Sequence, residues 1–498
     1  MDREVHRPRR APVGVSSIGR AAGALPSAPH SLCRSRPIAG PRILSRPPRP
    51  PAPPPTPGER RLGRTLLLAV VVLVCTATLV PAEKPLVREF GYWCLVCGRA
   101  GMADVLANVL LFVPLGVGAA LAGWPARRTI AAGLALSVGV ELTQLLVVTG
   151  RFATLSDVVT NTTGAGLGGV LARHWRRLLA PGEALAWRLA TGAAAGWLLA
   201  IAGSAWALER DPAPGPPRPA VSPLLAPPLS GWYAGRPVLA SVGPERVVPR
   251  RGGPLLVLAG TPREVGVTLE AIGADRRDAF VPMLFVHGAA EPEPEVLVGQ
   301  RRGDAVLRVR LRARSARLRV PEVRLRGFFD EAGARTRFTL SGGLRGTVLH
   351  LAGRHAGDRG ALAPPPRQAT LALAPTLGWA LLAPFVRLGD PLAPLVTVLW
   401  LAGLLLPLGY WGAHAARTRA RSAALLAGVA ILAGLGVVPW IGGFRAATAL
   451  EWAAAVAGLL GGAGAAWLAR ERRTAPSPRQ RRATGEPAPA GSSSGVSR

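Results

Sequence analysis

The sequence predicts a polytopic α-helical membrane protein of about eight spans with an extracytoplasmic antiparallel β-sandwich insert. Three observations support this class. Hydrophobic residues make up 49% of the 498 residues and only 18% are charged, against roughly 25% in soluble domains. Long apolar runs lie on both sides of residues 208–370, which lack them. The net charge is +32, from 60 Lys and Arg against 28 Asp and Glu, which on so apolar a chain excludes a soluble cytosolic enzyme.

The basic residues gather at the two ends of the chain. Residues 1–64 contain thirteen arginines and three acidic residues among many prolines, and residues 469–498 repeat this composition. Segments with so few large apolar residues cannot bury a core, so both ends are expected to be disordered tails. Nothing between the arginines resembles an aromatic platform for nucleic acid. We interpret both tails as cytoplasmic anchors beside the membrane, with no nucleic-acid partner.

Eight apolar runs reach the roughly 20 residues that a helix needs to cross a bilayer. Five fall in residues 65–207 and three in residues 391–468, at 65–82, 103–123, 129–149, 156–173, 185–207, 391–411, 422–441 and 447–468. A cytoplasmic N-terminus also places the arginines that follow the second, fourth and sixth runs in the cytoplasm. Both termini are then cytoplasmic, and residues 208–370 lie outside. The proline-interrupted run in residues 371–390 is expected to end the insert and continue as an interfacial segment.

Residues 208–370 change from a helical to a strand period. In AVLRVRLRAR (305–314), the apolar residues Leu307, Val309 and Leu311 alternate with arginines, as in a half-buried strand. Further strands are expected at 265–274, 283–288, 295–300, 316–320, 337–342 and 346–353. Short strands separated by turn residues predict an antiparallel sandwich. It could bind cell-wall glycan or simply pack on the membrane helices, and its arginine face is interpreted as solvated.

Polar residues occupy the outer ends of three consecutive predicted spans. Within each span they lie three or four residues apart and so share one helix face. The second and fourth spans run inward and the third outward, so all of these positions fall in the outer half of the bilayer. Ionisable residues there are costly and indicate function. They are Asp104 and Asn108, Glu141 and Gln144, Arg151 in the following loop, and Asp157 and Asn161.

Two interpretations of these residues are open. In the functional one, they line a polar cavity that opens to the outer leaflet. Glu141, Asp104 and Asp157 are then the candidate catalytic acids or bases, Arg151 holds a phosphate or carboxylate, and the three amides contact the ligand. In the structural one, Arg151 pairs with a carboxylate and the amides only hold the helices together. We take the functional interpretation as the working hypothesis.

Three blocks of this region resemble one family. DVLANVLLFVPLG, ELTQL and RFATLSDVVTNTTGAGLG, in this order and spacing, are similar to the VanZ-like family of bacterial membrane proteins over about residues 65–175. The polar residues named above occupy the motif positions of the family. WCLVCGRAG and the strand-rich insert resemble the subgroup that carries a concanavalin- or laminin-G-like jelly-roll domain. The family name derives from low-level teicoplanin resistance, so the resemblance implies a role in the cell envelope and no particular reaction.

Cys94 and Cys97 form a C-x-x-C in the loop before the second span. An oxidising exterior favours a structural disulfide between them. Free thiols, a metal site or a redox pair are the alternatives, although zinc would need two more ligands.

The leading hypothesis is an inner-membrane protein that binds or processes an envelope lipid or a lipid-linked cell-wall intermediate. The alternative is a non-catalytic envelope scaffold or glycan-binding protein. A transporter is disfavoured, because the inner halves of the three helices are apolar. No nucleotide, metalloprotease or nucleophile motif occurs, so no metal or cofactor is expected and the sequence leaves open whether the protein is an enzyme.

Overall fold

A computed structural model describes residues 54–79, 91–148, 152–211, 218–221, 236–242, 245–247, 265–273, 280–287, 294–330, 336–358, 365–383 and 386–474. Most of both predicted tails lies outside the described residues, as does Arg151.

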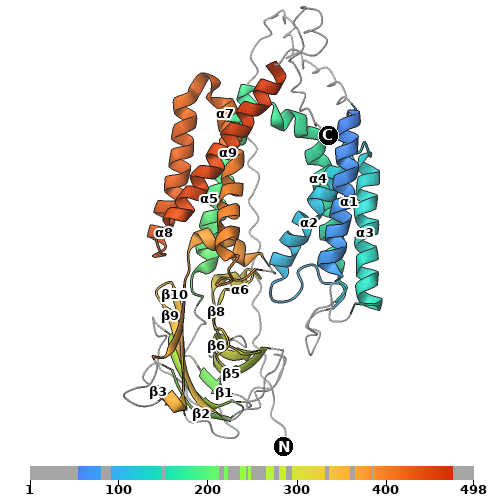
Figure 1. Ribbon diagram of the computed structural model, residues 1–498. Helices are drawn as coiled ribbons and strands as arrows, with labels where there is room; N and C mark the ends of the chain where they lie inside the picture. Colours follow the sequence, from blue (N-terminus) through green and yellow to red (C-terminus); the bar gives the residue numbers. More distant parts are fainter. Residues whose placement is uncertain are drawn as a thin grey trace, which may run out of the picture. The chain divides into compact units, whose positions relative to one another are not determined.

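Four helices form the N-terminal bundle (Figure 1). They are α1 (Pro57–Thr78), α2 (Gly101–Leu121), α3 (Ala126–Leu146) and α4 (Leu155–Leu179). Their shared core contains Val74 and Phe112, both fully buried. The bundle is therefore the compact unit that positions the polar residues.

Helix α1 begins earlier than the apolar run that predicted it. The Thr56 side chain accepts a hydrogen bond from the Glu59 backbone N–H, and the Glu59 carboxylate accepts one from Thr56 N. This reciprocal capping box satisfies backbone donors at the helix start. Residues 57–64 are therefore helical, and the prediction that a disordered tail extends to residue 64 is wrong for them.

Glycines set the close packing and the relative directions of these helices. Gly164 and Gly168 of α4 lie against the Val109 and Val113 carbonyls of α2, so the two helices run parallel. Along α3, Thr129 lies against Gly169, Gly133 lies against Ala165, and Ser137 accepts a hydrogen bond from Asn161. Because the partners on α4 come in reverse order, α3 runs antiparallel to α4. Small residues allow such backbone approach in membrane helices.

In the part of the chain that the structure describes, seven helices are long and apolar enough to cross a membrane. The protein is a multi-pass helical membrane protein with a β insert. Helix α4 is not one of the seven, although its 25 residues would reach about 37 Å. Its first half, LSDVVTNTTGAGLGG, is too polar and glycine-rich to qualify by hydropathy. The predicted count of eight spans therefore stays a prediction.

A second bundle contains α5 (Glu183–Leu208), α7 (Ala393–Leu432) and α9 (Ala449–Thr474). Helix α7 breaks at Arg419, and its second part continues through a π-helical turn, η3 (Ala433–Val437), into α8 (Val438–Ile441). At the core, the fully buried Trp197 of α5 donates from its indole N–H to a carbonyl of α7, 2.9 Å away. Tyr410 and Trp411 of α7 donate to carbonyls at the end of α4, so hydrogen bonds join the two bundles.

The insert consists of two antiparallel sheets. One has the strand order β1-β5-β6-β7-β8 and the other β11-β10-β9-β4-β2-β3. Met283 and Leu307 of the first sheet and Leu269 and Leu340 of the second belong to one buried cluster. The two sheets therefore share a hydrophobic core. The strands are β1 (Arg218–Val221), β2 (Arg236–Val242), β3 (Glu245–Val247), β4 (Val265–Ile272), β5 (Phe280–His287), β6 (Pro294–Arg301), β7 (Asp304–Val309), β8 (Glu322–Leu325), β9 (Arg337–Arg345), β10 (Val348–His355) and β11 (Arg367–Ala372).

Two strand predictions need correction. The strand predicted for 305–314 ends at Val309, and residues 312–315 form a short helical turn, α6 (Arg312–Ser315). The strand predicted for 316–320 is absent. Arg317 has a φ of 53°, a left-handed conformation that extended chain cannot adopt. The next strand, β8, instead begins at Glu322.

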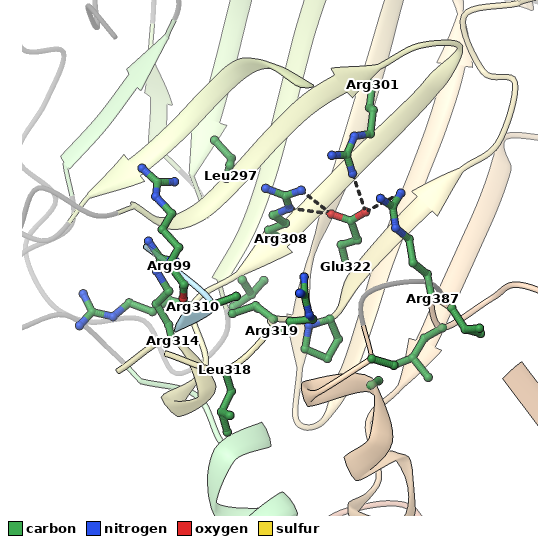
Figure 2. Close-up of a pocket in the computed structure, with 18 residues that line it drawn as sticks. Arg99, Leu297, Arg301, Arg308, Arg310, Arg314, Leu318, Arg319, Glu322 and Arg387 are labelled. Atoms are coloured by element: carbon green, nitrogen blue, oxygen red, sulfur yellow. Dashed lines mark hydrogen bonds and ion pairs between the residues drawn. The ribbon is translucent and has the colours of Figure 1, made fainter. Parts of the chain in front are cut away.

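Two arginines of the segment predicted as a strand over 305–314 are also less solvated than predicted. The Arg308 guanidinium lies 2.6 Å from the Glu322 carboxylate (Figure 2). It also lies 4.5 Å from the centre of the Phe280 ring. Arg310 pairs with Asp211 at 3.2 Å, and its side chain is only 12% exposed. This face of the strand is therefore built from fixed ion pairs.

The predicted interfacial segment is a 3₁₀ helix, η2 (Pro375–Leu381), that follows β11. Trp379 is 3% exposed and donates to Thr397 of α7 at 2.9 Å, and Thr376 donates to Glu451 of α9 at 2.5 Å. The segment is therefore buried between the insert and the second bundle.

Candidate functional site

The predicted polar residues of α2, α3 and α4 converge on one cavity of about 410 Å³, within the range of small-molecule sites. It lies where α2 and α4 begin and α3 ends. Of the seven residues predicted from the sequence, six line it and Arg151 lies outside the described residues. The six are Asp104, Asn108, Glu141, Gln144, Asp157 and Asn161.

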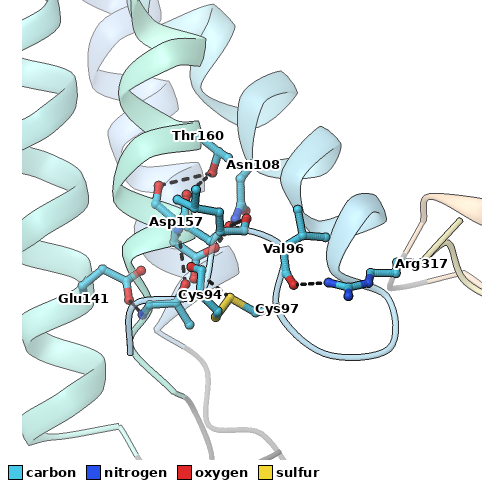
Figure 3. Close-up of a disulfide and its surroundings, with 11 residues drawn as sticks. Cys94, Val96, Cys97, Asn108, Glu141, Asp157, Thr160 and Arg317 are labelled. Atoms are coloured by element: carbon cyan, nitrogen blue, oxygen red, sulfur yellow. Dashed lines mark hydrogen bonds between the residues drawn. A yellow bond between two sulfur atoms is a disulfide. The ribbon is translucent and has the colours of Figure 1, made fainter. Parts of the chain in front are cut away.

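Asp157 is held at the start of α4 by its neighbours. Its backbone N–H donates to the Thr154 hydroxyl at 3.2 Å, an N-cap interaction that favours a helix start at this point. Its carboxylate accepts a 2.5 Å hydrogen bond from the Asn108 amide of α2 (Figure 3). The predicted spacing of four residues on α2 and the first turn of α4 thus bring an amide and a carboxylate together.

Glu141 is the most enclosed carboxylate of the cavity. It is 7% exposed, and its Oε2 accepts a hydrogen bond from the Thr154 backbone N–H at 2.8 Å. The same threonine therefore caps Asp157 through its side chain and holds Glu141 through its backbone. Thr154 therefore links the end of α3 to the start of α4 at the cavity.

Asn161 carries a buried acceptor that no described residue satisfies. Its amide NH₂ donates to the Ser137 hydroxyl of α3 at 2.9 Å, whereas its Oδ1 has no hydrogen-bond partner within the described ranges. The residue is 4% exposed, and leaving such an atom unpaired costs roughly 1–3 kcal/mol. Asn161 is one of the residues that line the cavity.

One of the two arginines that line the cavity comes from the insert. Arg319 donates to the Asp104 carboxylate at 2.6 Å, and it also donates to the Leu382 carbonyl. Sequence reasoning missed this residue, because it lies in a segment predicted as a strand and 215 positions from Asp104. No local pattern indicates which arginine of the insert reaches the helices.

Gln144 serves chiefly to hold the bundle. Its amide donates to the Thr78 carbonyl at the end of α1, at 2.9 Å. This bond ties α3 to α1 at the level of the cavity. Within the described ranges, no group of three or more His, Cys, Asp or Glu is placed to hold a metal ion.

Residues 66–177 match the family model VanZ/LLP1. The chain carries a VanZ-like domain. The match includes all seven predicted motif positions, so the resemblance drawn from the sequence is confirmed. No curated protein and no solved structure matches the chain, and the jelly-roll likeness of the insert stays a prediction.

A loop with a disulfide closes one side of the cavity in the VanZ-like domain. Cys94 and Cys97 are joined (Figure 3), and Cys97 belongs to the cavity lining. The Leu95 carbonyl accepts a hydrogen bond from the Ser156 hydroxyl at 2.6 Å. The bridge therefore shapes the segment that packs on the start of α4.

The insert attaches to the VanZ-like domain at the start of α2. The Arg317 carbonyl accepts hydrogen bonds from Met102 N at 3.1 Å and Ala103 N at 3.4 Å. These N–H groups have no partner within their own helix. The Arg317 side chain donates to the Val96 carbonyl at 2.7 Å. The left-handed Arg317 thus caps a membrane helix through its carbonyl.

Proposed function

We propose that the VanZ-like domain binds, and processes or moves, an envelope lipid or a lipid-linked cell-wall intermediate in the polar cavity. The observation that carries this proposal is the buried Oδ1 of Asn161, which has no partner in the described residues and belongs to a residue that lines a cavity with two held carboxylates. A cavity built only to fasten helices would pair its buried acceptors. A hydroxyl or amide N–H of a ligand would satisfy this one.

The geometry supports acid–base chemistry better than nucleophilic or metal chemistry. The Thr154 backbone N–H holds the Glu141 carboxylate, and the Asn108 amide holds the Asp157 carboxylate. A carboxylate held in this way can accept or deliver a proton to a bound hydroxyl or phosphate group. Arg319 of the insert lines the cavity and contacts Asp104.

The proposed orientation places the cavity at the outer leaflet of the bacterial cytoplasmic membrane, with both termini in the cytoplasm. Helix α4 follows α2 in parallel through glycine contacts, so it is proposed as the eighth span at the same depth. The Glu59–Arg176 ion pair, at 2.6 Å, joins the start of α1 to the end of α4 at the opposite end of the bundle from the cavity. The insert then lies outside, on the cavity side.

A ligand of this kind would connect the protein to cell-wall synthesis, and through it to glycopeptide susceptibility. The second candidate function is a non-catalytic scaffold whose insert contacts glycan. The bonds from Asn108 to Asp157 and from Asn161 to Ser137 favour it, because they join three helices without needing a ligand.

Native mass spectrometry of the full chain separates the two. Wild type is compared with Glu141→Gln, which keeps the side-chain volume, and with Glu183→Gln, an exposed acid at the start of α5. Wild type and Glu183→Gln should retain an isoprenyl phosphate or lipid-linked intermediate that a still-folded Glu141→Gln loses at least tenfold. Retention of only bulk phospholipid by all three, or equal retention by Glu141→Gln, would reject the ligand site and leave the scaffold.

A further inference from the structure

Exposed tryptophans mark the ends of the membrane helices. Tryptophan collects at the two membrane–water interfaces, because its ring is apolar on one side and carries an N–H on the other. Each exposed tryptophan of the described residues lies in a loop beside a membrane helix or within the last two turns of one. They are Trp93, Trp124, Trp206, Trp440 and Trp467.

Two of them lie where the second bundle adjoins the insert. Trp206 is near the end of α5 and precedes Leu208, which packs in the core of the insert. Trp440 is in α8 and precedes Phe444, which packs in the same core. The helix ends attached to the insert therefore present exposed indole rings, as expected at a membrane interface.

The disulfide-bridged loop, residues 92–97, presents a third exposed tryptophan on this side. Trp93 is 82% exposed, and the large side chains of Tyr92 and Leu95 are exposed as well. The sequence of the loop, YWCLVC, has no charged side chain. An uncharged loop that exposes two aromatic rings and a leucine is suited to the boundary between headgroups and acyl chains.

The loop is tied to its surroundings through its backbone. The Tyr92 carbonyl accepts a hydrogen bond from Leu155 N at the start of α4, at 2.9 Å. The Val96 carbonyl accepts one from the Arg317 side chain of the insert (Figure 3), and the Leu95 carbonyl is also occupied. An unpaired backbone acceptor is costly in apolar surroundings. Because these three are paired, the loop can enter the lipid region without that cost.

The length of α2 matches the separation of the two interfaces. Helix α2 lies between the loop that contains Trp93 and the turn that contains Trp124. Its 21 residues span about 32 Å, close to the roughly 30 Å of the hydrocarbon core. The two tryptophans therefore fall at opposite faces of one bilayer.

We propose that residues 92–97 insert into the headgroup region of the leaflet on the insert side, with Trp93 and Leu95 in contact with lipid. The occupant of this surface is the bilayer, because the loop adjoins the ends of apolar membrane helices whose lateral faces already meet lipid. The tryptophans of the second bundle mark the same interface. The inference goes beyond the proposed function, since this contact forms whether or not the polar cavity holds a ligand.

Insertion of the loop also sets the depth of the polar cavity. Cys97 of the loop belongs to the cavity lining. Asp104 and Asp157 are the fourth and third residues of α2 and α4, so they lie within about 5 Å of the helix starts. The headgroup region extends roughly 5 Å or more beyond the hydrocarbon core. Both carboxylates then lie at headgroup level, where an ionised group is far less costly than at the bilayer centre.

Fluorine NMR of the full chain, labelled with fluorotryptophan and placed singly in phosphatidylcholine nanodiscs, tests the proposal. Trp93→Phe identifies the Trp93 resonance by its loss, and Trp93→Tyr repeats the assignment if the first variant unfolds. The fully buried Trp197, assigned through Trp197→Phe, is the matched control. Three paramagnetic probes report position: lipid spin-labelled near the headgroup, lipid spin-labelled near the chain end, and a water-soluble gadolinium chelate.

Lipid labelled near the headgroup should broaden the Trp93 resonance at least threefold more than lipid labelled near the chain end. The Trp197 resonance should change little with any probe. Broadening of Trp93 by the chelate alone would place the loop in water, and no response to any probe would mean that protein covers it. Either result overturns the proposal, as does a stronger response to the chain-end label. Lipid retention in native mass spectrometry tests the proposed function separately, so each can fail while the other stands.

Discussion

Replacement of Gly168 by alanine should push α4 away from α2 and destabilise the VanZ-like domain. A Cβ at this position would overlap the Val113 carbonyl and lie 3.0 Å from Val117 N. Both are backbone atoms of α2, so neither can rotate aside and one helix must move. Overpacking of this kind costs up to roughly 3 kcal/mol. The greater helix propensity of alanine offsets about 1 kcal/mol, so the net loss of unfolding free energy is about 2 kcal/mol.

Gly166→Ala provides the matched control on the same helix. A Cβ there would meet only a side-chain atom of Ile130 at 3.8 Å, an ordinary contact. Reversible unfolding in mixed micelles with increasing dodecyl sulfate, followed by circular dichroism, should show Gly166→Ala unchanged or slightly more stable. A loss of about 2 kcal/mol corresponds to a roughly 30-fold change in the unfolding equilibrium. Equal stability of the two variants would refute the backbone-contact argument for α2 and α4.

Three other changes have expected outcomes. Reduction of the Cys94–Cys97 disulfide should cost about 2 kcal/mol, the loop-closure value for so short a loop. It should lower the melting temperature of wild type but not of the double serine variant. Glu451 is 3% exposed and pairs with Arg445 at 2.7 Å, so Glu451→Ala should cost about 3–5 kcal/mol. In a double-mutant cycle, Arg445→Ala should recover part of this loss, and strict additivity would contradict the pairing. Trp197→Phe removes the indole donor to the Ala430 carbonyl, which keeps a backbone donor at Ala433, and should cost about 0.5–1.5 kcal/mol in chemical unfolding. An unchanged midpoint would argue against this hydrogen bond.

Much of the helical architecture follows from local sequence. An apolar run of sufficient length forms a membrane helix wherever it lies in the chain, because its backbone must be satisfied internally. The four-residue spacing of Asp104 and Asn108 and of Asp157 and Asn161 places each pair on one face for the same local reason. The sequence therefore predicted that six polar residues would share a level of the bundle, and the structure places all six around one cavity.

The start of α1 shows where apolar patterning was insufficient. The run of large apolar residues begins near residue 65, but the helix begins at Pro57 because Thr56 and Glu59 cap each other. The signal was present in the sequence as a capping-box spacing. It was obscured by the arginines that follow, which were assigned to the tail.

The position at which β7 ends is not encoded by the local pattern. Alternation of apolar residues and arginines continues past Val309, so local pattern alone extends the strand. The chain instead turns through α6, and the Arg317 carbonyl that follows accepts hydrogen bonds from N–H groups at the start of α2. Those bonds join residues more than 200 positions apart, and no periodicity in either segment encodes them.

The sequence by itself determined the membrane class, the period of each segment and the face of each helix that is polar. Only the tertiary structure decided which cation meets those faces. The chain contains dozens of arginines that are alike as residues, and Arg319 becomes the partner of Asp104 solely because the insert is fastened to α2 beside it. The selection is made by the three-dimensional path of the chain, since ion pairing depends on distance in space and not on distance in sequence.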